Sequence, residues 1–140
     1  MLVASDRFGE LEIEEDRVLQ FDDGLLGFPE AKRFAMLDTH DTGVYFWLQS
    51  LDDPGLAFLS VVPWSFFPDY EPHLPEGEQA SLGLRSASEA IVLCLLTVQR
   101  DQEAITANLL GPLVVNGTTR KGRQVVLAES GYPVRAPLAA

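Results

Sequence analysis

The chain has 140 residues, of which 10 are Lys or Arg and 21 are Asp or Glu, giving a formal net charge of −11 at pH 7. Its length and its 46% hydrophobic content fit a single domain over residues 1–140 and exclude a disordered chain. The negative charge argues against direct nucleic-acid binding, because it repels phosphates, and it favours basic partners.

The cysteine content and the length of the apolar runs predict where in the cell the protein lies. Cys94 is the only cysteine and lies in IVLCLL, so we expect a buried side chain, no intrachain disulfide and a cytoplasmic protein. No run near the start resembles a signal peptide, and none has the roughly 20 apolar residues that span a bilayer. We therefore expect no membrane partner.

The first strand pattern is ELEIE at residues 10–14, where alternation places Leu11 and Ile13 on one face. RVLQF at 17–21 is predicted to be its paired strand, and residues 22–24 favour a tight reversal. The outer face of the first strand is acidic and consists of Glu10, Glu12 and Glu14. Residues 1–30 hold nine acids and two bases, so this charge either attracts a basic partner or serves solubility alone.

Three aromatic and β-branched strands are predicted next, at residues 33–37, 44–51 and 56–62, separated by turn residues. The inward-facing side chains of the second strand are Phe46, Leu48 and Leu51. Residues 63–77 contain four prolines, too closely spaced for a helix or a central strand, so an extended crossing segment is expected.

The second half of the chain continues this β pattern. One or two helical turns are predicted at residues 76–84, followed by a strand at 91–98. Further strand candidates lie at 104–109, 112–116 and 124–127, with a polar hairpin tip at 116–123.

These elements predict an all-β fold with at most one or two short helices. Nine or ten short strands are typical of a sandwich or of a small antiparallel or mixed barrel. Because a closed barrel leaves no strand edge exposed, we favour a single barrel-like domain.

The run TANLLGPLVVN at residues 106–116 is either a site with two amides or a folding feature. We predict that its five aliphatic residues are core and that Gly111-Pro112 makes a corner between two strands. Asn108 and Asn116 would then bind backbone groups at its ends, and Asn116-Gly117 would begin the hairpin turn.

No pattern for catalysis, metal binding or cofactor binding emerges. His40 and His73 stand apart in loops, and the Asp22-Asp23 and Asp52-Asp53 pairs resemble turns. GLLGF at 24–28 lacks the phosphate-loop pattern and is interpreted as a bend that packs Leu25 and Phe28 inward. The basic cluster Arg120, Lys121 and Arg123 is interpreted as a solvated hairpin tip.

The segment SFFPDYE stands out as a possible contact surface. Phe66, Phe67 and Tyr70 lie on a stretch stiffened by proline, beside Asp69 and Glu71. Such rings lose little conformational entropy on binding and suit an interface anchor whose acidic rim selects a basic partner. The alternative is that one or both Phe rings close the end of the barrel.

The order of segments resembles the FliW family of flagellar assembly factors. The resemblance runs from FGELEIEEDRVLQFDDGLLGF through YFWLQS, LAFLSVVPWSFFPDYEPHL and LLTV to TANLLGPLVVN and RQVVL, over roughly residues 6–138. One departure is Leu26, which replaces the proline of the family's usual GLPGF.

The resemblance implies a barrel-like, non-enzymatic regulator in the cytoplasm. Members of the family bind flagellin and, in many bacteria, the basic RNA-binding repressor CsrA. FliW that is freed by flagellin export sequesters CsrA and thereby relieves the repression of flagellin translation.

Our leading hypothesis is a regulator that switches between flagellin and CsrA. The predicted contact residues, inferred from exposure and charge, are Phe66, Phe67, Tyr70 and Glu71, with Glu10, Glu12 and Glu14 as an electrostatic rim. One alternative is a small-molecule-binding or hydrolytic barrel whose mouth lies near Trp47, Trp64 and His73. Another is a flagellin chaperone that does not bind CsrA.

Overall fold

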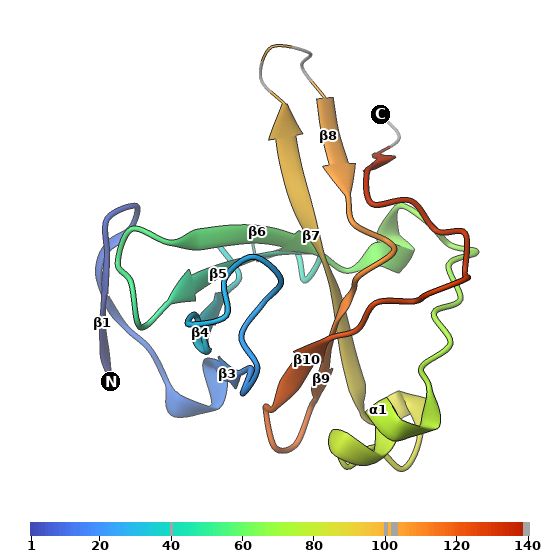
Figure 1. The fold of residues 1–140 in the computed structure, drawn as a ribbon. Coiled ribbons are helices and arrows are strands. Elements are labelled where there is room, and N and C mark those ends of the chain that lie inside the picture. Colours follow the sequence, from blue (N-terminus) through green and yellow to red (C-terminus); the bar gives the residue numbers. More distant parts are fainter. Residues whose placement is uncertain (40, 100, 102–103, 139–140) are drawn as a thin grey trace.

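The computed structural model describes residues 1–39, 41–99, 101 and 104–138, and these residues are mostly β-structure (Figure 1). Strands β1 (Leu2–Ser5) and β2 (Gly9–Glu12) form a separate antiparallel hairpin. The expected pairing of residues 10–14 with 17–21 is wrong, because the short 3-10 turn Glu15–Arg17 redirects the chain away from a tight reversal. β2 pairs with β1 instead.

The other strands form one curved antiparallel sheet, with the path β10-β9-β7-β6-β5-β4-β3. Its first four strands in the chain are β3 (Val18–Gln20), β4 (Arg33–Leu37), β5 (Tyr45–Ser50) and β6 (Ala57–Val61). They are followed by β7 (Ala90–Gln99), β8 (Ala104–Ala107), β9 (Leu113–Asn116), β10 (Gly122–Gln124) and β11 (Ala136–Pro137). β8 lies off the path and pairs with both β7 and β11.

β7 connects the two halves of this arrangement. Its residues 90–93 pair with β9, its residues 96–99 pair with β8, and Cys94 and Leu95 pair with β6. Together β7 and β8 extend beyond the body of the sheet (Figure 1). The ten residues of β7 therefore pair with three different strands, and β7 joins β8 and β9 to the rest of the sheet.

The predicted all-β class is confirmed, but the sheet is not a closed barrel. Among the described residues, the only backbone pairing between its two ends is an isolated parallel bridge between Gln20 and Lys121, where the Gln20 N–H donates to the Arg120 carbonyl oxygen at 2.9 Å. The expected short helix is present as α1 (Glu76–Ser81). No helix among the described residues is long and apolar enough to cross a membrane.

The last predicted strand, at 124–127, is placed too late in the chain. β10 occupies residues 122–124, inside the stretch that we predicted to be a polar tip. Gly122 explains this shift, because a Cβ at this position would lie 2.7 Å from Cε1 of Phe21 and 2.8 Å from Cγ2 of Val115. The close approach that glycine permits lets β10 pair with β9 above the buried Phe21 ring.

Alternation along the central strands divides the buried side chains between two main clusters. Leu93, Leu113 and Val115 face the first cluster, whereas Cys94 and Val114 face the second. The first cluster also contains Leu19, Phe21, Phe34, Phe46 and Leu48, so the inward orientation predicted for the last two is confirmed. A third, smaller cluster joins the β1–β2 hairpin to the sheet through Val3, Ile13 and Ala35. Half-buried Leu51 packs against it.

The run at residues 106–116 is the folding feature that we predicted, with four of its five aliphatic residues buried and Leu110 half-buried. Gly111 and Pro112 are buried at the corner between β8 and β9, and Asn108 Oδ1 accepts a hydrogen bond from Gly111 N at 2.9 Å. Asn116 Nδ2 donates to the Leu82 carbonyl oxygen, while its Oδ1 accepts from Thr118 N and Thr119 N. Both amides thus satisfy backbone groups.

The GLLGF bend is a turn closed by two hydrogen bonds between Leu25 and Phe28. Leu25 is buried as predicted, but the inward orientation of Phe28 is wrong: its side chain is 42% exposed and packs edge-on against Phe58. Leu26 donates its backbone N–H to Gln124 Oε1 at 2.9 Å. A proline at residue 26 could not make this bond, so the leucine ties the turn to β10.

The hairpin tip at 116–123 is not uniformly solvated. Arg123 pairs with Asp23 at 2.8 Å and with Glu78 at 2.7 Å, and it thereby connects β10 to the 22–24 turn and to α1. Two of the three predicted tip cations, Arg120 and Lys121, have no ion pair among the described contacts.

A buried amide connects the hairpin to the sheet. Gln49 is fully buried, and its Oε1 accepts a hydrogen bond from Ser5 Oγ at 2.7 Å. Its Nε2 lies within hydrogen-bond distance of the carbonyl oxygens of Ser50, Pro54 and Leu56, at 3.1, 3.2 and 3.2 Å. One side chain therefore holds β1, β5 and the turn that follows β5 in register.

Asp52 supports the same turn, which the sequence correctly predicts at residues 52–55. Burial alone would raise the pKa of this carboxyl, but hydrogen bonds from the backbone N–H groups of Lys32 and Arg33 and from the Arg33 guanidinium hold it below its ordinary value. The folded state therefore prefers the ionised form. Its contribution to stability is present at neutral pH and is lost as the pH falls through the folded-state pKa.

Replacing Asp52 by asparagine should consequently destabilise the protein at pH 7 by less than about 1 kcal/mol, since the ion pair is solvent-screened. The difference from wild type should shrink as the pH falls below about 4. Urea unfolding of both proteins at pH 7, 5 and 3 measures this difference in the free energy of unfolding. A difference that grows on acidification would contradict the assignment.

Candidate protein-binding site

The proline segment, residues 63–75, crosses one side of the molecule between β6 and α1 (Figure 1). It starts with a 3-10 turn over Pro63–Ser65, and Phe66 N and Phe67 N both donate to the Pro63 carbonyl oxygen. Proline removes backbone donors and fixes φ, so the stretch stays extended without strand partners. Its position therefore depends on its side chains.

Tyr70 is the principal anchor of the proline segment. Its ring is 4% exposed, and its hydroxyl donates to the Leu109 carbonyl oxygen at 2.7 Å. Its own carbonyl oxygen accepts from Trp64 Nε1 at 2.8 Å, and its ring lies 4.8 Å from that of Tyr132. Burial raises the pKa of the Tyr70 hydroxyl, which therefore stays protonated and continues to donate.

The predicted contact residues of the proline segment differ in exposure. The exposure that we expected for Tyr70 is wrong, because its ring packs in the second buried cluster. Phe66 and Phe67 are half-buried against the same cluster, and Phe66 lies 5.8 Å from Tyr45. Glu71 is exposed, and its backbone N–H donates to the Tyr132 hydroxyl at 2.9 Å. The ring of this segment that is fully core is that of Tyr70, which the alternative interpretation, made for the two Phe rings, did not include.

The acidic strand face lies away from the proline segment. Glu10, Glu12 and Glu14 are exposed as predicted, and Glu12 pairs with the N-terminal ammonium at 3.1 Å. However, the β1–β2 hairpin and the proline segment occupy opposite sides of the molecule (Figure 1). The two groups of predicted residues therefore form two separate surfaces, and the acidic strand face does not surround the rings.

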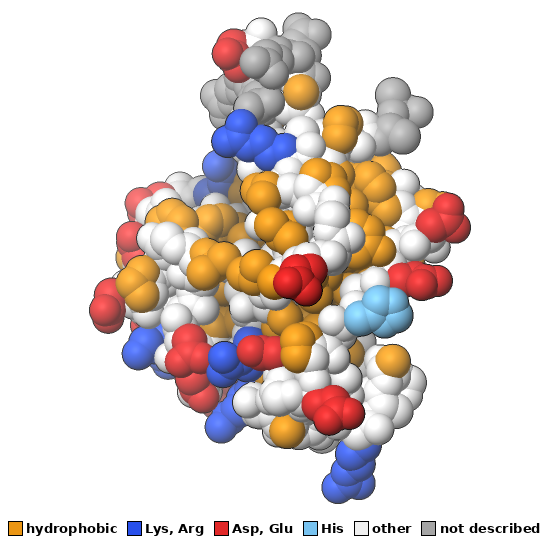
Figure 2. All heavy atoms as spheres, turned by 45° about the vertical axis from the view of Figure 1, so that its right-hand side comes forward, with side chains coloured by type: hydrophobic (Ala, Val, Ile, Leu, Met, Phe, Trp, Pro, Cys, Tyr) orange, Lys and Arg blue, Asp and Glu red, His pale blue; other side chains and the backbone are white. Residues whose placement is uncertain are grey.

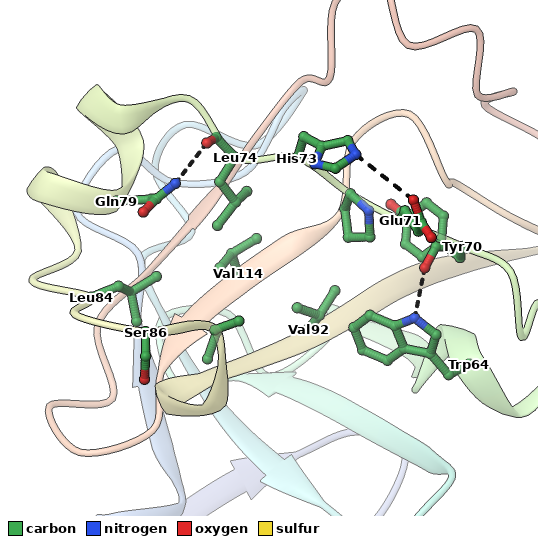
Figure 3. Close-up of a pocket in the computed structure, with 13 residues that line it drawn as sticks. Trp64, Tyr70, Glu71, His73, Leu74, Gln79, Leu84, Ser86, Val92 and Val114 are labelled. Atoms are coloured by element: carbon green, nitrogen blue, oxygen red, sulfur yellow. Dashed lines mark hydrogen bonds and ion pairs between the residues drawn. The ribbon is translucent and has the colours of Figure 1, made fainter.

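A groove lies between the proline segment, α1 and the sheet, and its volume is about 480 Å³. Its floor is formed by Val92 of β7 and Val114 of β9, while Trp64 closes one end (Figure 3). Pro72 and Leu74 of the proline segment line the groove, as do Leu84 and Ala87, and Ala90 lies on the floor beside Val92. We call this feature the β7–α1 groove.

Few polar groups reach the β7–α1 groove. Gln79 Nε2 donates to the Leu74 carbonyl oxygen at 2.8 Å and so joins α1 to the wall (Figure 3). Glu71 and His73 stand at the rim with 3.9 Å between Oε2 and Nε2, and both side chains are largely exposed. The groove is thus an apolar hollow with a polar edge.

Hydrophobic side chains also cover much of the surrounding surface, where acidic side chains and His73 lie along one border (Figure 2). Among the exposed apolar residues of the molecule are Val126 and Val134, at 48% and 53% exposure. A second hollow, lined by Val126 and Tyr132, shares Glu71 and His73 with the β7–α1 groove.

No arrangement for covalent chemistry is assembled around the groove. Cys94 is fully buried, and burial raises the pKa of its thiol to about 12, as expected for a core side chain. Among the described residues, no three His, Cys, Asp or Glu side chains are grouped to hold a metal ion. His40 lies outside the described residues.

The barrel mouth that we considered as an alternative does not form as predicted. Trp64 and His73 line the β7–α1 groove, but Trp47 is absent from its lining. Trp47 instead packs 5.7 Å from Phe8, with the Arg7 guanidinium 4.4 Å above its ring. The two tryptophans therefore belong to different surfaces.

The sequence analysis missed most of the β7–α1 groove. The usable signal is the alternation in β7, where Ala90 and Val92 share a face with Cys94. Nothing in the sequence shows that α1 and the proline segment stand off this face and leave it open.

Comparison with known proteins assigns the fold to a family. The model of the family described as FliW protein matches residues 2–138. The chain belongs to the FliW family. A crystal structure of the flagellar assembly factor FliW superposes with a TM-score of 0.88 at 33% identity, covering 100% of this chain and 98% of that one.

Curated FliW relatives are similar in sequence to this chain over most of its length. The flagellar assembly factor FliW of Natranaerobius thermophilus is 35% identical, and the match covers 99% of this chain and 92% of the relative. That of Symbiobacterium thermophilum is 42% identical over 88% of this chain and 90% of the relative. The resemblance described for residues 6–138 is thereby confirmed.

Proposed function

We propose that this FliW-family chain is a non-enzymatic cytoplasmic regulator of flagellum assembly that binds flagellin and antagonises CsrA by switching between them. The observation that carries the proposal is family membership over residues 2–138, supported by a FliW structure that matches the whole chain. The apolar groove and the net charge of −11 support a role in binding proteins, at least one of them basic.

The direct test measures binding of the purified chain to the flagellin and the CsrA of its host by biolayer interferometry at low salt. We expect micromolar or tighter binding to each. We also expect added flagellin to release bound CsrA, whether the two compete or act through coupled sites. Binding of neither protein would refute the proposal. Binding of flagellin alone would identify a chaperone that does not regulate CsrA.

The acidic strand face should steer a basic partner. Replacing Glu10, Glu12 and Glu14 by lysine changes the net charge by six and should slow association with CsrA several-fold, while the dissociation rate changes little. The triple glutamine variant is the control, and its association rate should lie between those of the wild type and the triple lysine variant. Stopped-flow measurements at 50 mM and 500 mM NaCl separate steering from contact, because salt should remove the difference. An unchanged association rate would refute steering.

A further inference from the structure

The β7–α1 groove is an uncovered part of the second buried cluster. On one face of the β7–β9 ladder, Leu93, Leu113 and Val115 are fully buried beneath the rest of the sheet. On the other face, Val92 and Ala90 remain half-exposed, because the proline segment and α1 leave a gap of about 480 Å³ above them. Apolar side chains of another molecule would complete this face and gain the burial that the chain itself does not supply.

The surroundings of the groove are acidic. Residues 69–90 carry five carboxylates and one cation, Arg85. Of these carboxylates Glu71 lines the groove, exposed on its rim 3.9 Å from His73. Glu78 is paired with Arg123, and Asp69, Glu76 and Glu89 lie in the flanking segments without an ion pair in the described structure. The complementary ligand therefore carries positive charge next to its apolar groups.

The size of the groove limits what can enter. A hollow of this volume is in the range that takes a small ligand or several side chains of a peptide, and it is too narrow for the flat surface of a folded domain. A neutral apolar metabolite would use the floor but not the acidic rim. A peptide that presents apolar side chains flanked by Lys or Arg uses both.

We propose that the β7–α1 groove is a docking site for a segment of a partner protein in which apolar side chains are flanked by Lys or Arg. The apolar side chains lie on Val92, between Leu74 and Leu84, and a cation faces Glu71. The choice of flagellin and CsrA as sources of this segment depends on the proposed function. The groove itself is inferred from its shape and charge.

The structure provides a reporter for occupancy. The chain has two tryptophans, and only Trp64, which is 42% exposed, lines the groove. In a Trp47→Phe background, Trp64 is the sole tryptophan, so a ligand that fills the groove should shift its emission to shorter wavelength. Overlapping 15-residue peptides that cover host flagellin and host CsrA are the probes.

A matched pair of variants tests the location. Ala87 lines the groove, whereas the adjacent Ser88 is exposed and does not. We expect Ala87→Phe to weaken binding of the active peptides by at least about tenfold by filling the groove, and Ser88→Phe to change it less than about twofold. Glu71→Lys should also weaken binding, and its effect should diminish at high salt.

The inference is supported if peptides that combine apolar residues with Lys or Arg shift Trp64 emission and lose affinity only in Ala87→Phe. It is overturned if no such peptide binds, if binding leaves Trp64 unchanged, or if both phenylalanine variants bind equally. Binding of a neutral apolar metabolite in place of peptides also overturns it. Full-length flagellin and CsrA, measured in parallel on the wild-type chain, show separately whether the proposed function stands.

Discussion

Replacing Tyr70 by alanine should lower the free energy of unfolding by about 3–5 kcal/mol, the range for a buried aromatic ring. Loss of the ring removes its contacts with Tyr132 and the second buried cluster, and loss of the hydroxyl leaves the Leu109 carbonyl oxygen without its partner. Because a domain of this size is stabilised by only about 5–15 kcal/mol, the variant should be close to unfolding at 37 °C. Chemical denaturation measures the loss.

The phenylalanine variant separates the two parts of this effect. Tyr70→Phe keeps the ring and should cost about 1–3 kcal/mol, the penalty for leaving a buried carbonyl oxygen unpaired. The Trp64 bond to the Tyr70 backbone is unaffected by either change. If phenylalanine were as destabilising as alanine, the hydroxyl and not the ring would be the anchor. If alanine cost less than about 1 kcal/mol, Tyr70 would not hold the proline segment.

Replacing Gln49 by glutamate should destabilise the fold severely although the two side chains have the same shape. The amide donates toward three carbonyl oxygens in a fully buried position, whereas an ionised carboxylate would repel all three. Each unsatisfied carbonyl costs about 1–3 kcal/mol, so the free energy of unfolding at pH 7 should fall by at least about 3 kcal/mol.

The Gln49→Glu variant should become more stable on mild acidification. Burial beside carbonyl oxygens raises the pKa of the introduced carboxyl above its unfolded value, so the folded state binds more protons and stability increases as the pH falls from 7 toward 5. Thr118→Glu, at an exposed position, is the control and should change stability by less than about 0.5 kcal/mol without this pH dependence. Equal behaviour of both variants would show that Gln49 does not hold the β1–β2 hairpin.

Local patterns predict most of this fold. The strand at residues 33–37 follows from its residue types and the turn residues beside it, the helical turns follow from the pattern at residues 76–84, and both are found. Asn108 and Asn116 serve as backbone partners because short amides prefer strand and turn ends. Near neighbours in the sequence decide these outcomes, except for the bond from Asn116 to Leu82, which lies 34 residues away.

Contacts between distant residues explain the errors. The pairing of β2 with β1 depends on the third cluster, which joins Val3 to Ala35, and β10 starts at Gly122 because Phe21 lies beneath it. Neither contact leaves a local signal. The candidate site illustrates the same point, since composition does identify the aromatic segment but not that Tyr70 turns inward to bind Leu109. The groove is open because the proline segment and α1 are spaced away from the sheet, and no local residue pattern predicts that spacing.

The single bridge between Gln20 and Lys121 has a consequence for how the chain folds during translation. Phe21 cannot be covered until Gly122 has left the ribosome, about a hundred residues later, so the nascent chain exposes an unfinished strand edge for most of its synthesis. Slowing translation over the last third of the message should therefore increase aggregation and dependence on general chaperones.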